Sequence, residues 1–250
     1  MTLSLRSVGA AALCALAASC ASTAGQTDVP VAAEAPSMTP WEVIGTSRGG
    51  RAVRAVDLGA GGPRLAYIAS IHGDEQEGAR HLDDLVELLR DAPADIRLYE
   101  DANPDGSAAN RRTTDAGVDP NRNWPARNFR PAAKRGPEPL SEPAVAAVHA
   151  DLVAFDPQLV IVLHSASRGP FVNYDGPAAG YAERFARAAG GAWTVEPSMG
   201  YETPGSLGSF MGVDRGVPIL TIEFRRGSTA EESRGPLLRA SCGDPPGSRC

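Results

Sequence analysis

A histidine and a glutamate stand three residues apart in the stretch Ile71–Glu75, which closes an apolar run beginning at Leu65. The length of that run suits a buried strand. Gly73 allows the backbone to bend between His72 and Glu75, so an imidazole nitrogen and a carboxylate oxygen can bind one Zn²⁺ at about 2.0–2.2 Å. The same stretch also fits a strand-end turn with a polar histidine and an acid that caps a helix, and it does not by itself decide between the two.

His164 follows a second apolar run, Leu159–Leu163. In a doubly wound sheet the ends of two such strands can meet in one crevice. His72, Glu75 and His164 would then be the three protein ligands of a catalytic zinc site, with one position left for water. Taken alone, His164 also fits a satisfied polar group at a strand end.

The two remaining histidines, His81 and His149, lie in helical segments among polar neighbours. We expect both to lie on solvated helix faces rather than at a metal.

Glu223 ends a third apolar run, Ile219–Ile222. A carboxylate there is costly unless it is paired or used. Beside a metal-activated water it could act as a general base and later pass the proton to a leaving amine. The alternative is a salt bridge to Arg225 or Arg226.

A long stretch rich in Asn, Pro, Gly and Arg runs from Asp101 to Pro139, and a loop of that length usually has a function. It contains Arg111-Arg112 and Asn121-Arg122. Arginine side chains bind carboxylates bidentately, and a fixed cation near a metal would stabilise an oxyanion. A solvated basic loop is the ordinary alternative.

The elements that would position these residues alternate between strands and helices. Apolar runs and alternation predict strands, and helical spacing predicts the helices between them. This order indicates an α/β fold: a single domain with a mixed, mostly parallel twisted sheet and helices on both faces. The predicted strands cover 51–58, 65–71, 96–99, 159–163, 192–195 and 217–224, and the predicted helices cover 78–90, 141–154, 181–189 and 229–240.

The N-terminal residues indicate export. Arg6, the apolar run Val8–Ala18 and the small residues after it are typical of an export signal, and the run is too short for a stable membrane span. Ala17–Cys20 resembles a lipobox, which would lipidate Cys20, whereas Ser22–Ala24 fits ordinary cleavage. We therefore expect an exported protein, periplasmic or anchored in the envelope as a lipoprotein. The predicted organisation is a leader (1–24), a flexible tether (25–40), a catalytic domain (41–240) and a tail (241–250).

The net charge and the cysteines limit which partners and which compartment the sequence favours. The formal net charge is −6 and the isoelectric point is near 5.3, which disfavours nucleic acid. Cys242 and Cys250 lie in the tail and could close a small loop in an oxidising compartment, or remain free thiols.

Together the motifs resemble, in order and rough spacing, the zinc carboxypeptidases of the carboxypeptidase A type. The first motif, the short domain and Thr203–Ser206 look most similar to the bacterial murein peptide amidase branch. The motifs are His72–Glu75, Asn103–Gly106, Gly117–Trp124, Leu163–Ser165 and Thr221–Phe224.

The resemblance implies a role for each matching residue. His72, Glu75 and His164 match the zinc ligands, and Glu223 matches the general base. Further matches are Asn121 and Arg122 as the grip on the substrate's terminal carboxylate, Arg112 as the group that polarises the scissile carbonyl, and Tyr201 as a mobile substrate contact. Thr114 departs from the family pattern, in which Asn often follows that arginine, so Arg111 stays an alternative to Arg112.

The implied activity is zinc-dependent hydrolysis of an amide bond next to a free carboxylate. The branch resemblance points to cell-wall peptides and to the bond between γ-D-glutamate and diaminopimelate. Alternatives are a broad metallocarboxypeptidase acting on ordinary peptides, a zinc-dependent deacylase of small acylated amino acids, and a lipid-anchored binding protein without turnover. The expected partner is a peptide with a free carboxylate.

Overall fold

The computed structural model describes residues 41–197 and 199–242. The predictions for the leader, the tether, lipidation at Cys20 and the pairing of Cys242 with Cys250 lie outside the described residues. The last helix ends at Cys242, so it extends two residues beyond the predicted end at Ala240.

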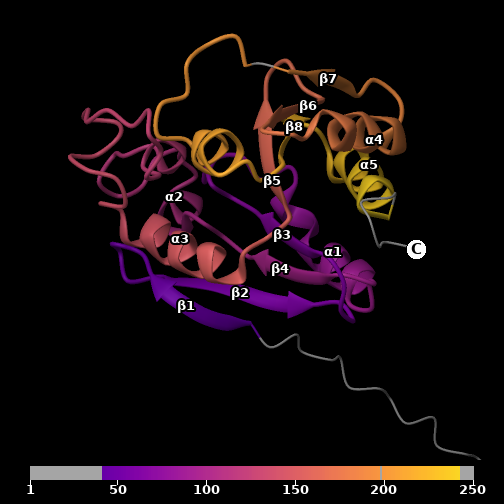
Figure 1. Cartoon of the computed structure of the whole chain (residues 1–250), viewed down its shortest axis with the longest axis horizontal. Helices are drawn as coiled ribbons and strands as arrows, with labels where there is room; N and C mark the ends of the chain where they lie inside the picture. The colour runs from indigo at the N-terminus through magenta and orange to yellow at the C-terminus, as the bar shows by residue number, and fades with distance from the viewer. Residues whose placement is uncertain (1–40, 198, 243–250) are drawn as a thin grey trace, which may run out of the picture. The chain divides into compact units, whose positions relative to one another are not determined.

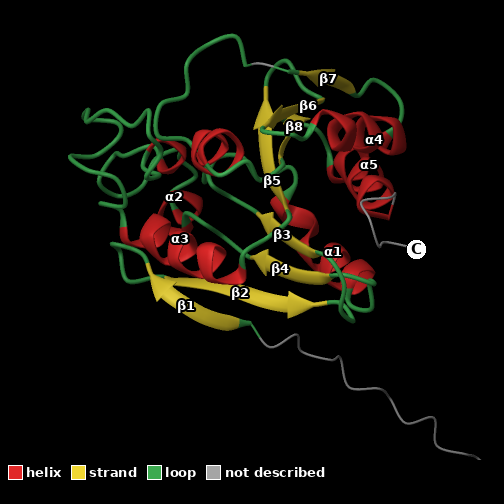
Figure 2. Ribbon diagram, viewed as in Figure 1, coloured by secondary structure: helices red, strands yellow, loops and turns green. Residues whose placement is uncertain are grey.

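In the described part of the chain, eight strands form one mixed sheet in the order β1-β2-β4-β3-β5-β8-β6-β7 (Figures 1 and 2). The four central strands, β4, β3, β5 and β8, are parallel, and β7 is parallel to β6. The pairs β1–β2, β2–β4 and β6–β8 are antiparallel. The strands are β1 Glu42–Thr46, β2 Ala52–Leu58, β3 Arg64–Ile68, β4 Asp95–Tyr99, β5 Leu159–Ala166, β6 Phe171–Asp175, β7 Thr194–Glu196 and β8 Ile219–Arg225.

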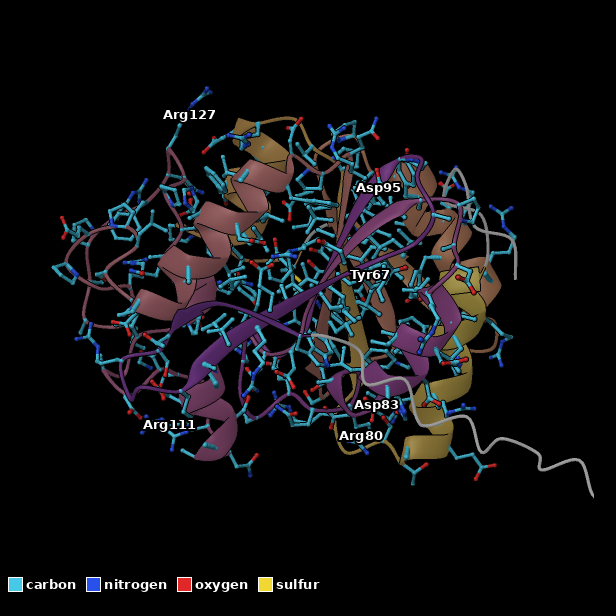
Figure 3. All side chains as sticks on the ribbon, turned by 90° about the horizontal axis from the view of Figure 1, so that it is seen from below. Tyr67, Arg80, Asp83, Asp95, Arg111 and Arg127 are labelled. Carbon is cyan, nitrogen blue, oxygen red and sulfur yellow. The ribbon has the colours of Figure 1, made fainter. Side chains whose placement is uncertain are left out.

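Helices cover both faces of the sheet, as predicted. The larger apolar cluster packs α1, α4 and α5 against one face, and the second cluster packs α3 and the π-helix η3 against the other. Figure 3 shows Tyr67 in the interior, whereas Arg127 and Asp83 project from the surface. The helices are η1 Ala79–His81, α1 Leu82–Leu89, α2 Pro104–Ala108, η2 Pro120–Arg122, α3 Pro143–Phe155, α4 Ala179–Ala189, η3 Gly208–Asp214 and α5 Ala230–Cys242.

The central strands are buried on both faces, which makes them detectable in the sequence. Leu65 and Tyr67 belong to one apolar cluster, and Ala66 and Ile68 belong to the other. A strand buried on both faces has a continuous apolar sequence, because successive side chains point to opposite sides. The predicted α/β fold with a mixed, mostly parallel sheet is therefore confirmed.

Several local predictions need correction. β3 ends at Ile68 rather than Ile71, because Ser70 adopts a left-handed φ of 52° that turns the chain out of the sheet. The stretch 101–139 is not without structure, since it contains α2 and η2. β1 and β6 were not predicted, because they are five-residue strands without an apolar run.

The carboxyl ends of β3, β5 and β8 lie side by side in the sheet. β5 continues through His164 to Ala166, and His164 is directly paired in register with Glu223 of β8. Chemistry at this edge is the usual arrangement of open α/β sheets.

Candidate metal centre and active site

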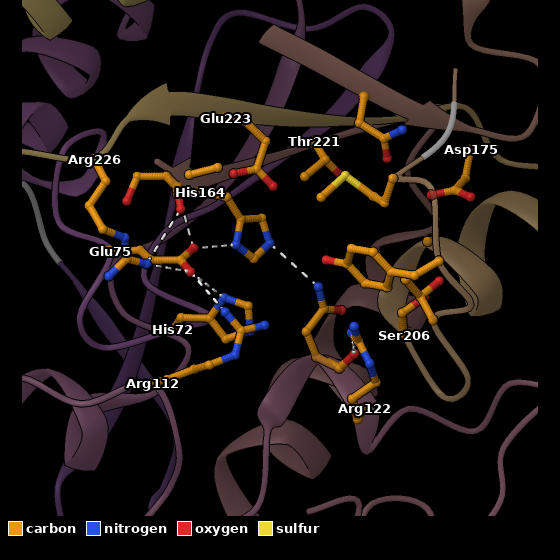
Figure 4. A pocket seen from close by; sticks show the side chains of 18 of the residues that line it. His72, Glu75, Arg112, Arg122, His164, Asp175, Ser206, Thr221, Glu223 and Arg226 are labelled. Carbon is orange, nitrogen blue, oxygen red and sulfur yellow. Dashed lines mark hydrogen bonds and ion pairs between the residues drawn. The ribbon is translucent and has the colours of Figure 1, made fainter. Parts of the chain in front are cut away.

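Three side chains that could bind a metal meet in one buried cluster. His72 and Glu75 lie in the turn after β3, and His164 lies near the carboxyl end of β5 (Figure 4). Each is at most 4% exposed, and one ligand atom from each lies within 4.8 Å of the others. The tertiary structure thus brings together the three residues predicted as zinc ligands.

The donor atoms of this cluster fit zinc. Nδ1 of His164 lies 2.7 Å from Oε2 of Glu75, and Nδ1 of His72 lies 3.0 Å from Oε1 of the same carboxylate. Nδ1 of His72 is nevertheless buried without a hydrogen-bond partner among the described residues, which calls for an explanation such as an ion. Two imidazole nitrogens and a carboxylate oxygen form a catalytic zinc donor set that leaves a fourth position open.

The charges around Glu75 keep its carboxylate ionised. Burial by itself raises the pKa of Glu75, but His164 and then His72 outweigh burial and hold that pKa well below its usual range. Arg112 and Arg226 each donate to Oε1 of Glu75, both at 3.0 Å. A carboxylate must be deprotonated to bind a metal, and these contacts keep Glu75 in that form.

Asp119 contacts the ring nitrogen of His72 that faces away from Glu75, a role that the sequence analysis did not predict. Its Oδ1 lies 3.1 Å from Nε2 of His72, and its Oδ2 accepts from Nε of Arg112 at 3.0 Å. Metal-binding histidines typically donate their other ring N–H to such a carboxylate, which leaves Nδ1 available. Burial raises the pKa of Asp119, but His72 outweighs it and the pKa lies below its usual range. The sequence feature that could have indicated this role is the position of Asp119 two residues before Asn121.

Glu223 lies in the same pocket as the metal cluster and forms no ion pair among the described residues. It is 5% exposed and lines the same pocket as the triad. Burial raises the pKa of Glu223 above its ordinary value. The alternative of a salt bridge to a neighbouring arginine is wrong for the described residues, because Arg226 pairs with Asp74 and Glu75, and Arg225 forms no ion pair with Glu223.

The two adjacent arginines point to different places. Arg112 lines the pocket, donates to Glu75, and leaves its Nη2 without a partner among the described residues. Arg111 instead pairs with Asp115, four residues further along the chain. The side chain of Asn103 holds this segment by donating to the carbonyl of Arg112 at 3.2 Å. Of the two candidates, Arg112 is therefore the one that faces the cluster.

Asn121, Arg122 and Tyr201 line the same pocket. The side-chain carbonyl of Asn121 accepts a hydrogen bond from the backbone N–H of Leu207 at 2.9 Å. Nη1 of Arg122 donates to the backbone carbonyl of Asn121 at 2.7 Å. Tyr201 is 58% exposed, so its ring is little constrained by packing. The structure thus brings all eight predicted site residues to one pocket.

Glycines allow the two loops of the site to approach each other. A Cβ on Gly73 would lie 2.0 Å from the carbonyl carbon of Gly106, so only glycine fits between the metal-binding turn and α2. Asn103 caps α2 by accepting the N–H of Gly106 at 3.1 Å. The Asn103–Gly106 motif therefore holds the loop that carries Arg112 against the turn that carries His72.

The prediction that His81 and His149 lie on solvated helix faces is wrong. His81 is 4% exposed and its Nε2 lies 2.8 Å from the hydroxyl of Ser233, between η1 and α5. His149 is half-buried, with its ring centroid 6.1 Å from that of Trp124 and 5.1 Å from that of Phe210. Neither belongs to the metal cluster. Packing between distant helices covers them, and the local sequence does not report that packing.

Comparison with known proteins agrees with this geometry. Murein peptide amidase A of Escherichia coli K12 is 29% identical over 194 residues, covering 68% of this chain and 75% of the relative. The crystal structure of the murein-tripeptide amidase of Escherichia coli O157 superposes with a TM-score of 0.69 at 25% identity, covering 82% of this chain and 92% of that one. Carboxypeptidase A of Helicoverpa armigera shares the fold, with a TM-score of 0.65 at 15% identity, covering 81% of this chain and 67% of that one.

The family model for zinc carboxypeptidases matches residues 29–198. That range contains the three side chains of the metal cluster and Arg112, whereas Arg226 and Glu223 lie beyond it. The chain belongs to the zinc carboxypeptidase family, as a zinc-dependent hydrolase.

Proposed function

We propose that this protein is an exopeptidase of cell-wall peptides, which hydrolyses the amide bond between γ-D-glutamate and diaminopimelate. The observation that carries the proposal is the convergence, on one pocket, of a metal triad, a buried glutamate and the Asn121-Arg122 pair. An arginine beside the site suits a terminal carboxylate, which makes cleavage exo rather than internal. The 29% identity to a murein peptide amidase supports murein as the source of the peptide.

Each polar group predicted from the sequence has a task in this reaction. Bound at His72, Glu75 and His164, Zn²⁺ supplies Lewis acidity toward the amide carbonyl and lowers the pKa of water. Glu223 takes a proton from the attacking water and delivers it to the departing nitrogen.

The two arginines act on the two ends of the substrate. Arg112 offers its remaining N–H groups to the carbonyl oxygen, which gains negative charge as water adds. Arg122 pairs with the free carboxylate of the leaving residue, and Asn121 adds a side-chain amide beside it. Tyr201 covers the substrate from the exposed side. A broad metallocarboxypeptidase would use the same groups, so only the identity of the substrate distinguishes that activity from cleavage of cell-wall peptides.

We also propose that the protein acts outside the cytoplasm, where such peptides are found. The leader predicted over residues 1–24 supports export, and Cys20 is the candidate for a lipid anchor. In the described part of the chain no helix has the length and apolar character needed to cross a bilayer. Cell fractionation of wild type and Cys20→Ser, with mass spectrometry of the mature N-terminus, tests both statements.

The decisive experiment pairs metal content with turnover for wild type and Glu223→Gln. We expect one zinc per chain in both proteins, hydrolysis of L-Ala-γ-D-Glu-diaminopimelate by wild type, and a loss of at least about 100-fold in the variant. Cleavage of ordinary peptides without cleavage of this tripeptide would replace the substrate and keep the mechanism. Absence of stoichiometric zinc in both proteins would contradict the mechanism itself.

A further inference from the structure

A basic loop, residues 120–137, begins at η2, and the proposed reaction uses only its first cation. The loop contains no acid, although the chain as a whole has a formal net charge of −6. Its five cations are Arg122, Arg127, Arg130, Lys134 and Arg135. Figure 3 shows Arg127 projecting from the surface, and Asp214 contacts the backbone N–H of that residue rather than its guanidinium. Such a concentration of one charge attracts ligands of the opposite charge.

Three of these cations line one groove, which we call the basic groove. Its lining residues are Asp119, Arg122, Ala132, Ala133, Lys134 and Arg135. Arg122 also lines the active-site pocket, so the two hollows meet at this residue. In Figure 4 it lies at the edge of the active-site pocket away from Arg226. The basic groove therefore adjoins the place where the free carboxylate of the substrate is proposed to bind.

Hydrogen bonds of the backbone fix the basic groove to the metal centre. The N–H of Asp119 donates to the carbonyl of Lys134 at 2.9 Å, and the carboxylate of Asp119 contacts His72. The side chain of Asn123 donates to the carbonyl of Arg135 at 2.6 Å. These contacts use the main chain of Lys134 and Arg135, so they hold the two residues in place and leave the charged side chains available.

The cations of the basic groove form no ion pair with any acid in the part of the chain that the structure describes. Asp119 borders the groove, but its two oxygens contact His72 and Arg112. Nε of Arg135 is buried and has no hydrogen-bond partner among the described residues. A buried donor without an acceptor calls for an explanation, and an anion bound in the groove would supply the acceptor.

The chemistry of the groove fits carboxylates carried by a peptide. Guanidinium groups bind carboxylates bidentately, and Ala132 and Ala133 offer apolar surface to the carbon chain between them. Cell-wall peptides carry free carboxylates on both γ-linked glutamate and diaminopimelate, and Arg122 is proposed to bind only one of them. Because the groove opens beside the active-site pocket, an anion bound there belongs to the same polymer as the substrate.

We propose that the basic loop, with the basic groove as its binding site, is a docking surface for the carboxylate-rich peptides of the cell wall. The inference rests on the proposed function and adds a second contact between the enzyme and the polymer that carries its substrate. Attraction between exposed charges speeds the encounter and is weakened by salt. The surface therefore acts on binding and on KM, and it leaves kcat unchanged.

The test is co-sedimentation of the zinc-loaded Glu223→Gln protein with insoluble peptidoglycan, either native or with its carboxylates converted to amides. We expect binding to the native polymer that weakens as salt rises from about 0.05 to 0.5 M, and much weaker binding to the amidated polymer. Adding Lys134→Gln and Arg135→Gln should weaken binding to the native polymer by about 3- to 10-fold, the range of two exposed ion pairs, with an unchanged melting temperature. Arg187→Gln with Arg225→Gln, which removes two exposed charges outside the basic groove, should leave binding within about twofold.

Turnover separates this inference from the proposed function. With Glu223 intact, the variant that lacks Lys134 and Arg135 should hydrolyse soluble L-Ala-γ-D-Glu-diaminopimelate with the kcat of wild type. Hydrolysis together with equal binding to native and amidated peptidoglycan would overturn the docking surface and keep the reaction. Carboxylate-dependent binding through the two cations, without hydrolysis of any cell-wall peptide, would reject the reaction and keep the docking surface. Binding to phosphatidylglycerol vesicles but not to peptidoglycan, or an equal loss in the variant that lacks Arg187 and Arg225, would also overturn the docking surface.

Discussion

The contact between Asp119 and His72 makes a quantitative prediction for zinc affinity. In Asp119→Asn one carboxylate oxygen becomes an NH₂ group of the same size. In wild type the two carboxylate oxygens of Asp119 face Nε2 of His72 and Nε of Arg112. In the variant one of these two donors therefore loses its acceptor. Removing the partner of a metal-bound histidine typically weakens metal binding or activity about 10- to 100-fold. The expected cost is thus about 1.4–2.7 kcal/mol of zinc binding free energy.

The assay is competition for zinc with a chromophoric chelator, followed by the melting temperature with and without metal. Asp151→Asn is the matched control, because Asp151 also accepts from an arginine and one further donor, Arg97 at 2.8 Å and the hydroxyl of Tyr99 at 2.8 Å, but does not line the active-site pocket. Asp151→Asn should lower stability without changing the zinc Kd. A zinc Kd for Asp119→Asn within about twofold of wild type, or an equal loss of affinity in the control, would show that Asp119 does not support zinc binding through His72.

Three further predictions follow from the same contacts. Arg112→Ala should lower kcat/KM by about 100-fold or more, whereas Arg111→Ala should change it by a few-fold only, as steady-state kinetics with one substrate would show; equal effects would contradict the assignment. Gly73→Ala should lose about 1–3 kcal/mol of unfolding free energy in urea, because its Cβ would meet Gly106, and an unchanged urea midpoint would count against this. Burial raises the pKa of Asp101 from 3.8 to about 6, so the folded state binds the proton more tightly and stability falls by up to about 3 kcal/mol as pH rises from about 4 to 6. Asp101→Asn should lack that fall in urea titrations across this pH range, and a parallel pH profile would reject the explanation.

The site owes its precision to contacts between segments far apart in the chain. Glu75 alone is held by His164 from β5, by Arg112 from the loop after α2, and by Arg226 after β8. Because these partners come from separate elements, a change in any one of them affects the position of the carboxylate. The parallel sheet places the three carboxyl-terminal ends side by side, so the turn after β3 that carries His72 and Glu75 lies next to the end of β5 that carries His164.

Much of the fold and of the site could be predicted from the sequence. The continuous apolar runs before His72, His164 and Glu223 are detectable because a strand buried on both faces must be apolar throughout. The residue types at the strand ends then limit the chemistry, since two histidines and a carboxylate with one further glutamate suit zinc hydrolysis. Short segments were harder: β6 has only five residues of mixed polarity, and its pairing with β8 is a long-range contact.

Local sequence patterns are sufficient to predict the α/β architecture, the strands that precede the site residues and the chemical types of the metal-binding residues. The folded structure was needed to distinguish Arg112 from Arg111, to place Asp119 next to His72, to reveal that His81 is buried against Ser233, and to show that Asp175 lines the pocket. The physical reason is the range of the interactions. Periodicity and backbone propensity act within one element and are encoded locally, whereas burial, ion pairing and pocket geometry depend on which elements become neighbours in space.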